Sequence, residues 1–572
     1  MRSHVDVSPG NSRLHLAVAL LLIPLWVLAP LSAWAQNRAV TIAIVSGNNQ
    51  ALVPLKPSAA LVVQVVDDQG APVADAAVAW QANGATASLA ASSTRTDSNG
   101  QSQNTLTTVL PGTYTVTAAV NCDCSQSSPS VTFSFTNGVA NLPALTPPQV
   151  AVANAIDRAC PALATSSNTL TAPQQDFLAR CSEVVVGASS AAVPSALDAM
   201  LNNKAQPQNQ LASGVQSSQL NNLNARFAEL RQGAHGLSLG GVGFIDNGRV
   251  VSLAMLGDAF RKDAAQGSDE VGKDFDRWGF FATGMIDSGG FDATAVAPGF
   301  DFHNASLTAG VDYRFNAEFV GGLALGYNHN ASDLDRNVGN LDVDGYGVSA
   351  YFSWYHANDW YIEGSLGLGR LDYDLKRNII YDIAALGSGG GTTHVDQVAR
   401  SSPDGDQSTF SLTAGHDFNR DAWSFSPYLR GIWSHLSLDA FDETIADSSA
   451  PGFGLATHVN SRSLSSQLGV LGGRLSYTIN ENWGVLVPNA VVEWNHEFKN
   501  DPQTVVTRFL ADPTQTPIIV TDPRIDQDYF NLGIGLNAIL PKGRSGFLYF
   551  EHVTGYSGVH ENRLSAGVRI EF

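Results

Sequence analysis

The sequence predicts an all-β-dominated protein: a twelve-stranded antiparallel transmembrane β-barrel and an immunoglobulin-like β-sandwich, joined by an α-helical linker with a helix in the pore. Three observations predict the barrel. The C-terminal residues alternate between apolar and polar, the connections between strand-like segments alternate between short and long, and aromatic residues collect at segment ends. A closed barrel explains all three, because closure leaves no unpaired backbone edge in the hydrocarbon of a bilayer.

Residues 563–572 carry the clearest alternation in the chain. A period of two, with one apolar and one polar face, is the pattern of a β-strand. We expect the apolar face to seat this strand in lipid and the polar face to line the lumen. The apolar side chains are Leu564, Ala566, Val568, Ile570 and Phe572. The polar side chains between them include Arg563, Arg569 and Glu571.

Twelve strand-like segments fill the C-terminal half of the chain, and their connections sort by length. Turns of two to four residues alternate with loops of up to about 35 residues, apart from a short last loop at 555–559. Outer-membrane barrels have short turns in the periplasm and long loops outside. Because the strand count is even, the first strand then begins and the last strand ends on the periplasmic side. The segments lie near 276–287, 302–313, 319–328, 343–356, 359–371, 407–419, 422–437, 461–479, 483–498, 526–540, 545–554 and 560–572.

Aromatic residues mark the ends of these segments. In a barrel they would form the girdles at the two membrane interfaces. In a soluble β protein the same residues would belong to the core, which is the alternative interpretation. The tryptophans concerned are Trp278, Trp354, Trp360, Trp423, Trp433, Trp483 and Trp494.

The net charge and the cysteines indicate which partners and which compartment to expect. The net charge is −20 and the pI is near 4.9, so we expect no nucleic-acid partner. The four cysteines form two local pairs, Cys122 with Cys124 and Cys160 with Cys181. Local pairs in an exported chain favour disulfides over zinc, because no histidine set lies nearby. A Cys-x-Cys bridge closes a tight ring, so the state of Cys122 and Cys124 stays open.

Residues 1–35 are predicted to be a secretory signal peptide. Basic residues precede an apolar core at 14–31, which ends in a small-x-small motif. That motif predicts cleavage between Ala35 and Gln36. We therefore expect the chain to enter the periplasm.

Residues 36–138 predict an immunoglobulin-like sandwich. Short β-rich runs are separated by turn signals such as Gly70-Ala71-Pro72 and Asp97-Ser98-Asn99-Gly100. The runs resemble the bacterial immunoglobulin-like repeats of the invasin and intimin group, in which such modules act as spacers or adhesive tips. The runs that carry this resemblance are 65–73, 78–80, 96–100 and 112–118.

The segment between the sandwich and the barrel is expected to be helical. Residues 139–214 are rich in Ala, Ser and Pro and predict a helical linker, which a Cys160–Cys181 bridge would staple. Residues 215–235 predict a helix that plugs the pore, because a narrow apolar stripe on a polar helix suits a polar lumen. Residues 236–275 then lead into the barrel at 276–572. The stripe consists of Leu220, Leu223, Phe227 and Leu230.

The order of these parts resembles the type V autotransporters of Gram-negative bacteria. The resemblance covers the whole layout and is most specific at 222–238 and in the final strand. It implies an outer-membrane barrel, monomeric in the lipid, that inserts with the barrel-assembly machinery and carries its passenger to the cell surface. We therefore expect translocation and display of a small passenger, for adhesion to a host or neighbouring-cell ligand.

The two alternative functions are a porin-like channel with a periplasmic immunoglobulin-like domain and a surface hydrolase. Ser238 lies in a Gly-Leu-Ser-Leu-Gly motif, but a helix is expected before it, where a nucleophile elbow needs a strand. The acidic stretch 333–344 lacks the spacing of a calcium loop. We therefore expect no catalytic residue, no metal and no cofactor.

Overall fold

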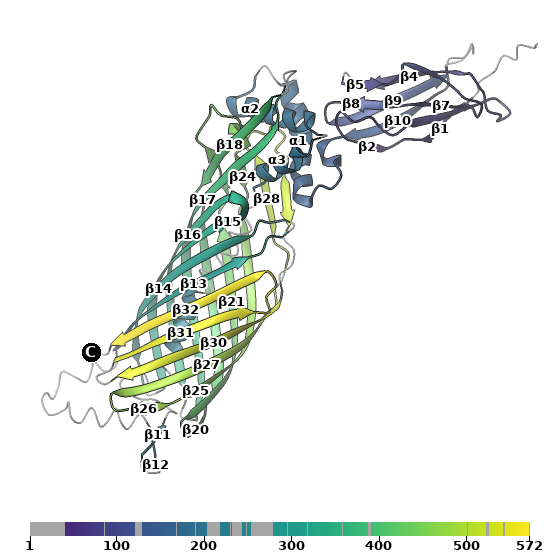
Figure 1. Cartoon of the computed structure of the whole chain (residues 1–572). Coiled ribbons are helices and arrows are strands. Elements are labelled where there is room, and N and C mark those ends of the chain that lie inside the picture. The colour runs from purple at the N-terminus through teal and green to yellow at the C-terminus, as the bar shows by residue number, and fades with distance from the viewer. Residues whose placement is uncertain are drawn as a thin grey trace, which may run out of the picture.

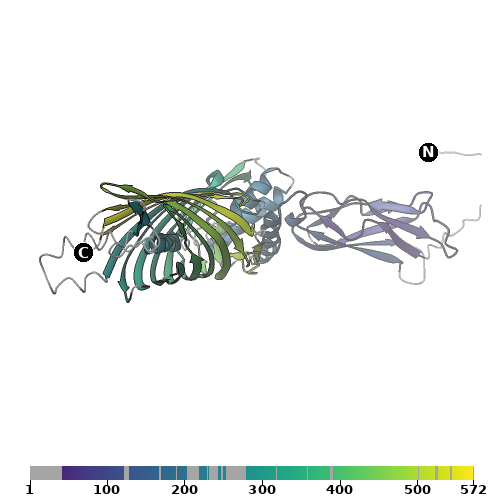
Figure 2. The ribbon, with the colours of Figure 1, turned by 90° about the horizontal axis from the view of Figure 1, so that it is seen from below.

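The computed structural model describes residues 41–570 except 85, 121–127, 167–168, 189, 203–217, 229, 231–242, 247–248, 253–277, 295, 317, 357, 387–390, 500, 522–525 and 541–543. Three parts follow one another in space (Figures 1 and 2). An N-terminal sandwich projects from a group of helices, and these helices cover one end of a long barrel.

Two sheets build the N-terminal sandwich, with strand orders β1-β3-β7 and β2-β10-β9-β4-β6, while β5 pairs with β8. Alternate strand positions point to one face, so Val63, Trp80 and Phe133 are buried between the sheets. This arrangement confirms the predicted immunoglobulin-like fold. The strands are β1 (Thr41–Ser46), β2 (Gln50–Leu52), β3 (Leu61–Val66), β4 (Ala77–Asn83), β5 (Ala87–Leu89), β6 (Ser93–Arg95), β7 (Gln101–Asn104), β8 (Leu106–Thr108), β9 (Gly112–Val120) and β10 (Ser130–Asn137).

Three helices follow the sandwich and are termed the cap. After the short η1 (Val139–Asn141) come α1 (Pro147–Thr165), α2 (Ala172–Val186) and α3 (Ala192–Met200). Thr146 and Gln149 form a capping box that begins α1, with proline in its first turn. A further helix, termed the pore helix, comprises residues 218–228 and 230. Among the described residues, no helix has both the length and the apolarity needed to cross a bilayer.

Of the described strands, twelve form a closed antiparallel barrel, as predicted. The first barrel strand β13 pairs with the last, β32, and β16 pairs with β17, which completes the ring. The outer face is apolar, with exposed leucines such as Leu307, Leu325 and Leu429. The strands are β13 (Trp278–Phe291), β14 (Phe300–Arg314), β15 (Phe319–Leu334), β16 (Gly339–Tyr355), β17 (Trp360–Ala384), β19 (Asp404–His416), β21 (Trp423–Leu438), β25 (Arg462–Tyr477), β27 (Gly484–Glu497), β30 (Asp528–Leu540), β31 (Arg544–Thr554) and β32 (Val559–Ile570).

The long connections, expected as loops, contain strands of their own. β17 runs far beyond the barrel and pairs with β18 (Thr392–Ser401), which in turn pairs with β23 (Thr444–Ile445). A separate sheet joins β22 (Phe441–Asp442), β24 (Thr457–Val459), β28 (Thr504–Phe509) and β29 (Ile518–Thr521). The remaining elements are β11 (Gly243–Asp246), β12 (Arg249–Ser252), β20 (Phe418–Arg420), β26 (Ile479–Glu481), η3 (Asp335–Asn337) and η4 (Phe453–Leu455).

The inner face of the barrel changes character along its length. Phe300 and Phe302 share one face of β14 with Asn304, which donates a hydrogen bond to Ser218 of the pore helix. Near the pore helix the lumen is therefore polar, but at the long-connection end it is lined by buried apolar side chains. We term this layer the apolar collar. Its members are Phe300, Phe302, Leu334, Leu341, Val343, Leu371, Tyr373, Leu375, Leu436 and Leu438.

Candidate translocation pore and cap

The pore helix lies against one side of the barrel wall. All four residues of its apolar stripe are buried, and Leu223, Phe227 and Leu230 share a cluster with the wall. The ring of Phe227 meets Tyr351 of β16 edge-on, with the ring centroids 5.8 Å apart. The stripe therefore attaches the helix to β13, β15 and β16. The wall residues of this cluster are Phe281, Val320, Ala324 and Tyr351.

Arg226 of the pore helix makes a buried ion pair with the same side of the wall. Its Nε and Nη2 donate to the Asp312 carboxylate of β14 at 3.0 and 2.5 Å. Tyr351 donates to the same carboxylate at 3.0 Å, and the guanidinium lies over the Phe281 ring. Arg226 is fully buried, so removing either partner would leave an uncompensated charge inside the protein.

Shorter polar side chains continue this contact along the helix. The Asn222 amide donates to the hydroxyls of Ser306 and Thr308 on β14, both at 3.1 Å. Gln219 donates to Ser349 and lies over the wall glycines Gly326 and Gly347. A Cβ atom at Gly347 would lie 2.5 Å from Gln219 Oε1, so the missing side chain makes room for the glutamine.

The terminal strand β32 places its residues on two faces. Leu564 and Val568 are 45% and 64% exposed on the outside of the barrel. Arg563 lines the lumen, where it donates to Glu551 and Glu561, each at 2.6 Å. The side chains of Ile570 and Phe572 lie outside the described residues, as do Ala35, Gln36, Cys122 and Cys124.

The cap shares a hydrophobic core with the long connections of the barrel. Cys160 of α1 and Cys181 of α2 form a disulfide with Cα atoms 5.9 Å apart. Phe177 of α2 packs against Phe509 of β28, with the rings tilted by 42° and their centroids 4.8 Å apart. The segment expected as a linker is therefore a folded unit whose apolar faces are covered by barrel extensions. The extensions contribute Ile379, Tyr381, Ile383, Val395, Ala399, Ile445, Leu455, Phe509, Ala511, Ile518 and Val520.

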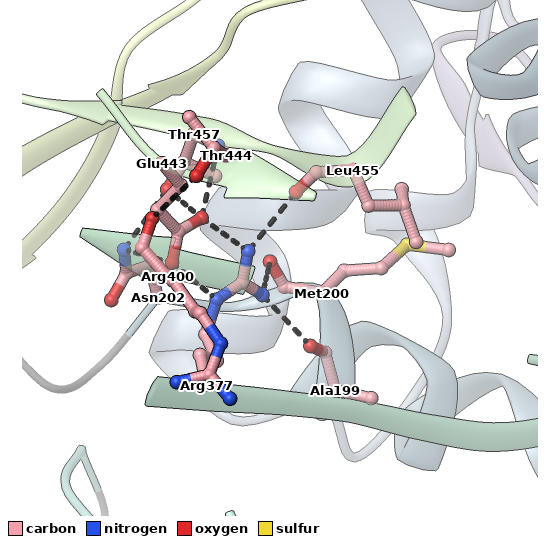
Figure 3. A network of polar contacts seen from close by, with 9 residues as sticks. All are labelled: Ala199, Met200, Asn202, Arg377, Arg400, Glu443, Thr444, Leu455 and Thr457. Carbon is pink, nitrogen blue, oxygen red and sulfur yellow. Dashed lines mark hydrogen bonds and ion pairs between the residues drawn. The ribbon is translucent and has the colours of Figure 1, made fainter. Parts of the chain in front are cut away.

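A buried ion pair joins the cap to three barrel extensions (Figure 3). Arg377 of β17 donates to both oxygens of Glu443 at 2.8 and 2.5 Å, and its other contacts are main-chain carbonyls. One of these is Ala199 at the C-terminal end of α3, where a cation is favoured by the helix dipole. Asn202 donates to Glu443 and to Thr457 of β24. The network thus fixes the end of the cap between β17 and β24.

A second polar contact fixes α2 against η4. The Asp176 carboxylate accepts hydrogen bonds from the main-chain N–H groups of Gly452 and Gly454. A Cβ atom at Gly454 would lie 2.2 Å from the carbonyl oxygen of Pro173. Only glycine therefore permits this close approach of the connection to the helix.

The joint between sandwich and cap depends on Asp157 of α1. Its carboxylate accepts hydrogen bonds from the N–H groups of Val139 and Ala140 at 2.8 and 3.0 Å. Burial raises the pKa of Asp157 to about 6, against the lowering effect of the two hydrogen bonds. Asn141 also donates to the carbonyl of Leu52 in the sandwich. These hydrogen bonds therefore connect the sandwich to the cap.

Sequence reasoning found the pore helix but missed the cap network. Arg377 and Glu443 lie 66 residues apart in segments expected as loops. One signal was present: Leu375, Ile379, Tyr381 and Ile383 continue the period of two beyond the membrane. That pattern predicts a longer strand, although it does not identify the partner of Arg377.

Two family matches describe most of the chain. Residues 280–551 match the family Autotransporter beta-domain, and residues 45–144 match the family Bacterial Ig-like domain (group 1). A closed outer-membrane barrel with a helix in its lumen is the class of protein that the fold defines. The matches place the chain among the type V autotransporters, outer-membrane proteins of Gram-negative bacteria, with an immunoglobulin-like N-terminal part.

Similar proteins cover only parts of this chain. It is 27% identical over 273 residues to Lipase 1 of Photorhabdus luminescens, across 47% of this chain and 38% of that protein. It is 25% identical over 191 residues to the Probable autotransporter YpjA of Escherichia coli, across 32% of this chain and 11% of that protein. The match thus spans well under half of each relative.

Two solved autotransporter domains are also similar to parts of this chain. The translocator domain of the autotransporter NalP from Neisseria meningitidis is 15% identical, with a TM-score of 0.39, over 56% of this chain and 95% of that domain. The β-domain of the Bordetella autotransporter BrkA is 20% identical, with a TM-score of 0.35, over 52% of this chain and 100% of that domain.

Proposed function

We propose that this autotransporter exports its immunoglobulin-like domain and holds it at the cell surface. The observation that carries the proposal is the position of the cap, which shares its core with the long connections of the barrel. Short turns face the periplasm in barrels of this kind, so the long-connection end faces outward. The sandwich extends from the cap at that end (Figure 1).

Protease treatment of intact cells tests this orientation. One epitope tag is inserted after Asn83 in the sandwich, and a control tag is inserted at Asp421, in a short turn of the barrel. We expect the first tag to be lost and the second to survive until the outer membrane is opened. Protection of both tags would place the sandwich in the periplasm and favour a porin-like channel.

Adhesion is the proposed purpose of display. The sandwich buries its own core, and within the described part of the chain β1 and β6 each pair with a single strand, so we propose that their other edge accepts an added strand. Cells with the full chain should bind host or neighbouring cells more than cells lacking residues 41–137. Equal binding, with equal amounts of folded barrel, would refute an adhesive role for the sandwich.

We propose no enzymatic activity for this chain. The names Lipase 1 and Esterase EstA belong to relatives of which the matches cover 38% and 25%. Ser238, the residue of the elbow-like motif, lies outside the described residues. Intact cells should hydrolyse a short-chain nitrophenyl ester at the rate of vector controls. Activity that disappears in Ser238→Ala would overturn this proposal.

The terminal strand is the proposed recognition element for the barrel-assembly machinery. β32 closes the barrel against β13, and its Leu564 side chain faces outward. An arginine on the lipid face costs about 2–4 kcal/mol at mid-bilayer. Leu564→Arg should therefore lower the fraction of heat-modifiable, folded barrel, whereas Ser557→Arg in the last loop should not. Equal folding of both variants would argue against this role.

A further inference from the structure

Three glycines form a row across the barrel wall beside the pore helix. Gly326 of β15 pairs with Gly347 of β16, which in turn pairs with Gly369 of β17. Gln219 of the pore helix lies over the first two of these glycines. Gln407 of β19 lies over the third, where a Cβ atom would be 2.6 Å from its Nε2. The helix and β19 therefore each place a glutamine on the same row of the wall.

A small cavity is lined by both of these glutamines. Its volume is about 10 Å³, close to the minimum of about 10–15 Å³ that one water molecule requires. The cavity therefore has room for a single molecule of that size and excludes an organic ligand. The side chains that give the lining its polar atoms are Gln219, Ser306, Thr308, Asn328 and Gln407.

Two of the lining residues are buried with polar atoms that lack a partner. Asn328 of β15 is only 4% exposed, and neither its Oδ1 nor its Nδ2 has a hydrogen-bond partner among the described residues. Gln407 is 8% exposed, and its Oε1 is likewise unpaired within the described part of the chain. A buried polar atom without a partner is costly, and in native proteins ordered water commonly satisfies such atoms.

We propose that one ordered water molecule binds in this cavity and joins the pore helix to β15 and β19. A water molecule donates two hydrogen bonds and accepts up to two. It can therefore donate to Gln407 Oε1, pair with a polar atom of Asn328, and accept from Gln219. The Gln219 amide has two N–H bonds, of which one is donated to Ser349.

The mixture of donors and acceptors distinguishes water from an ion. A metal cation would satisfy only the oxygens of Asn328 and Gln407, whereas an anion would satisfy only the nitrogen of Asn328. The described hydrogen bonds of Asn222 and Gln219 attach the helix to β14 and β16. The water extends this attachment to β19, which lies further round the wall.

A crystal structure of the full chain, at a resolution that shows ordered water, tests the site independently of where the sandwich is displayed. We expect one density peak at about 2.7–3.2 Å from Gln407 Oε1 and from a side-chain atom of Asn328. Crystals grown with rubidium should show no anomalous signal at this peak. An anomalous peak would identify a monovalent cation, and an empty cavity would show that nothing binds. Either of these results overturns the proposal.

A variant of Gln407 tests what the water does for the helix. Gln407→Met keeps the length of the side chain but removes its polar end, so the density peak should disappear. Amides of residues 218–228 should then exchange about two- to tenfold faster, the effect of one lost hydrogen bond. A peak that persists in this variant, or exchange at the wild-type rate, would overturn the proposal.

The matched control is Ser411→Ala, which removes a polar group from the same face of β19 outside the cavity. This variant should keep both the density peak and the wild-type exchange of the pore helix. Heat modifiability on gels verifies that each variant is folded.

Discussion

Replacing Glu443 with alanine tests whether the cap is fixed to the barrel extensions by its buried ion pair. The Glu443 carboxylate accepts two hydrogen bonds from Arg377 and one from the N–H of Thr457. The side chains of Arg377 and Glu443 are only 1% and 4% exposed. The variant leaves the guanidinium buried with main-chain carbonyls, such as that of Leu455, as its acceptors.

We expect the cap to lose about 3–5 kcal/mol of local stability, the usual cost of removing one partner from a buried pair. That cost corresponds to about a two-hundred- to five-thousand-fold larger opening constant for the cap. The barrel should be spared, because β13 and β32 close the ring through main-chain hydrogen bonds. The effect is therefore expected in α3 and β24 and not in the transmembrane strands.

Hydrogen exchange of the purified protein measures this difference segment by segment. Amides of residues 192–200 and 457–459 should exchange faster in Glu443→Ala, and Glu481→Ala, in an exposed short turn, serves as the control. A double variant, Arg377→Met with Glu443→Leu, should recover most of the protection because no charge is left buried. Unchanged exchange in α3, or an equal increase in β13, would refute the reasoning.

Four other perturbations follow from the same contacts. Gly454→Ala should lower the stability of the cap by about 1–3 kcal/mol and make α2 sensitive to protease, because the new Cβ atom would clash with the Pro173 carbonyl oxygen. An α2 that stays intact under protease would contradict this. Cys181→Ser should lower the cap unfolding midpoint by removing a bridge worth about 3 kcal/mol, and reductant should then have no further effect. Burial raises the pKa of Asp157 to about 6, above its ordinary 3.8. The joint should therefore be most stable below pH 4 and lose stability as the pH rises to 6. Asp157→Asn should remove this dependence of the stability on pH. Leu371→Ser in the apolar collar should raise conductance in planar bilayers, whereas Leu366→Ser on the outer face should not.

The barrel was predictable because its signals are local. A period of two recurs in most of the strands, although not every strand alternates cleanly, and the short turns lie between strands that are neighbours in the sequence. The pore helix was predictable for the same reason, since its apolar stripe is contained in a few turns. What the stripe contacts was not predictable, because Phe281, Val320 and Tyr351 come from three strands that only the closed barrel brings together.

The contacts of the cap could not be predicted from local sequence patterns. Its helices were expected, but their apolar faces are covered by residues such as Ile379 and Phe509, more than 150 positions away in sequence. The alternation continues beyond Leu371 in the sequence, but the predicted strand ends there and the residues that follow were expected to form a loop. A charged residue in an extension is usually solvated, and only the fold shows that Arg377 is buried.

Among the described residues, the pore helix leaves space beside it in the lumen, on the side lined by Tyr428, Asn489 and Tyr549. The apolar collar lies nearer the cap than this space does, and its side chains cannot replace the hydration shell of an ion. The helix and the collar are therefore layers of different chemical character along the lumen. The helix occupies part of the lumen through specific polar partners on β14 and β16, whereas the collar contributes apolar side chains from β14 to β17 and β21. The cap lies over the long-connection end of the barrel. The barrel wall and the cap that carries the sandwich therefore share extended strands, chiefly β17.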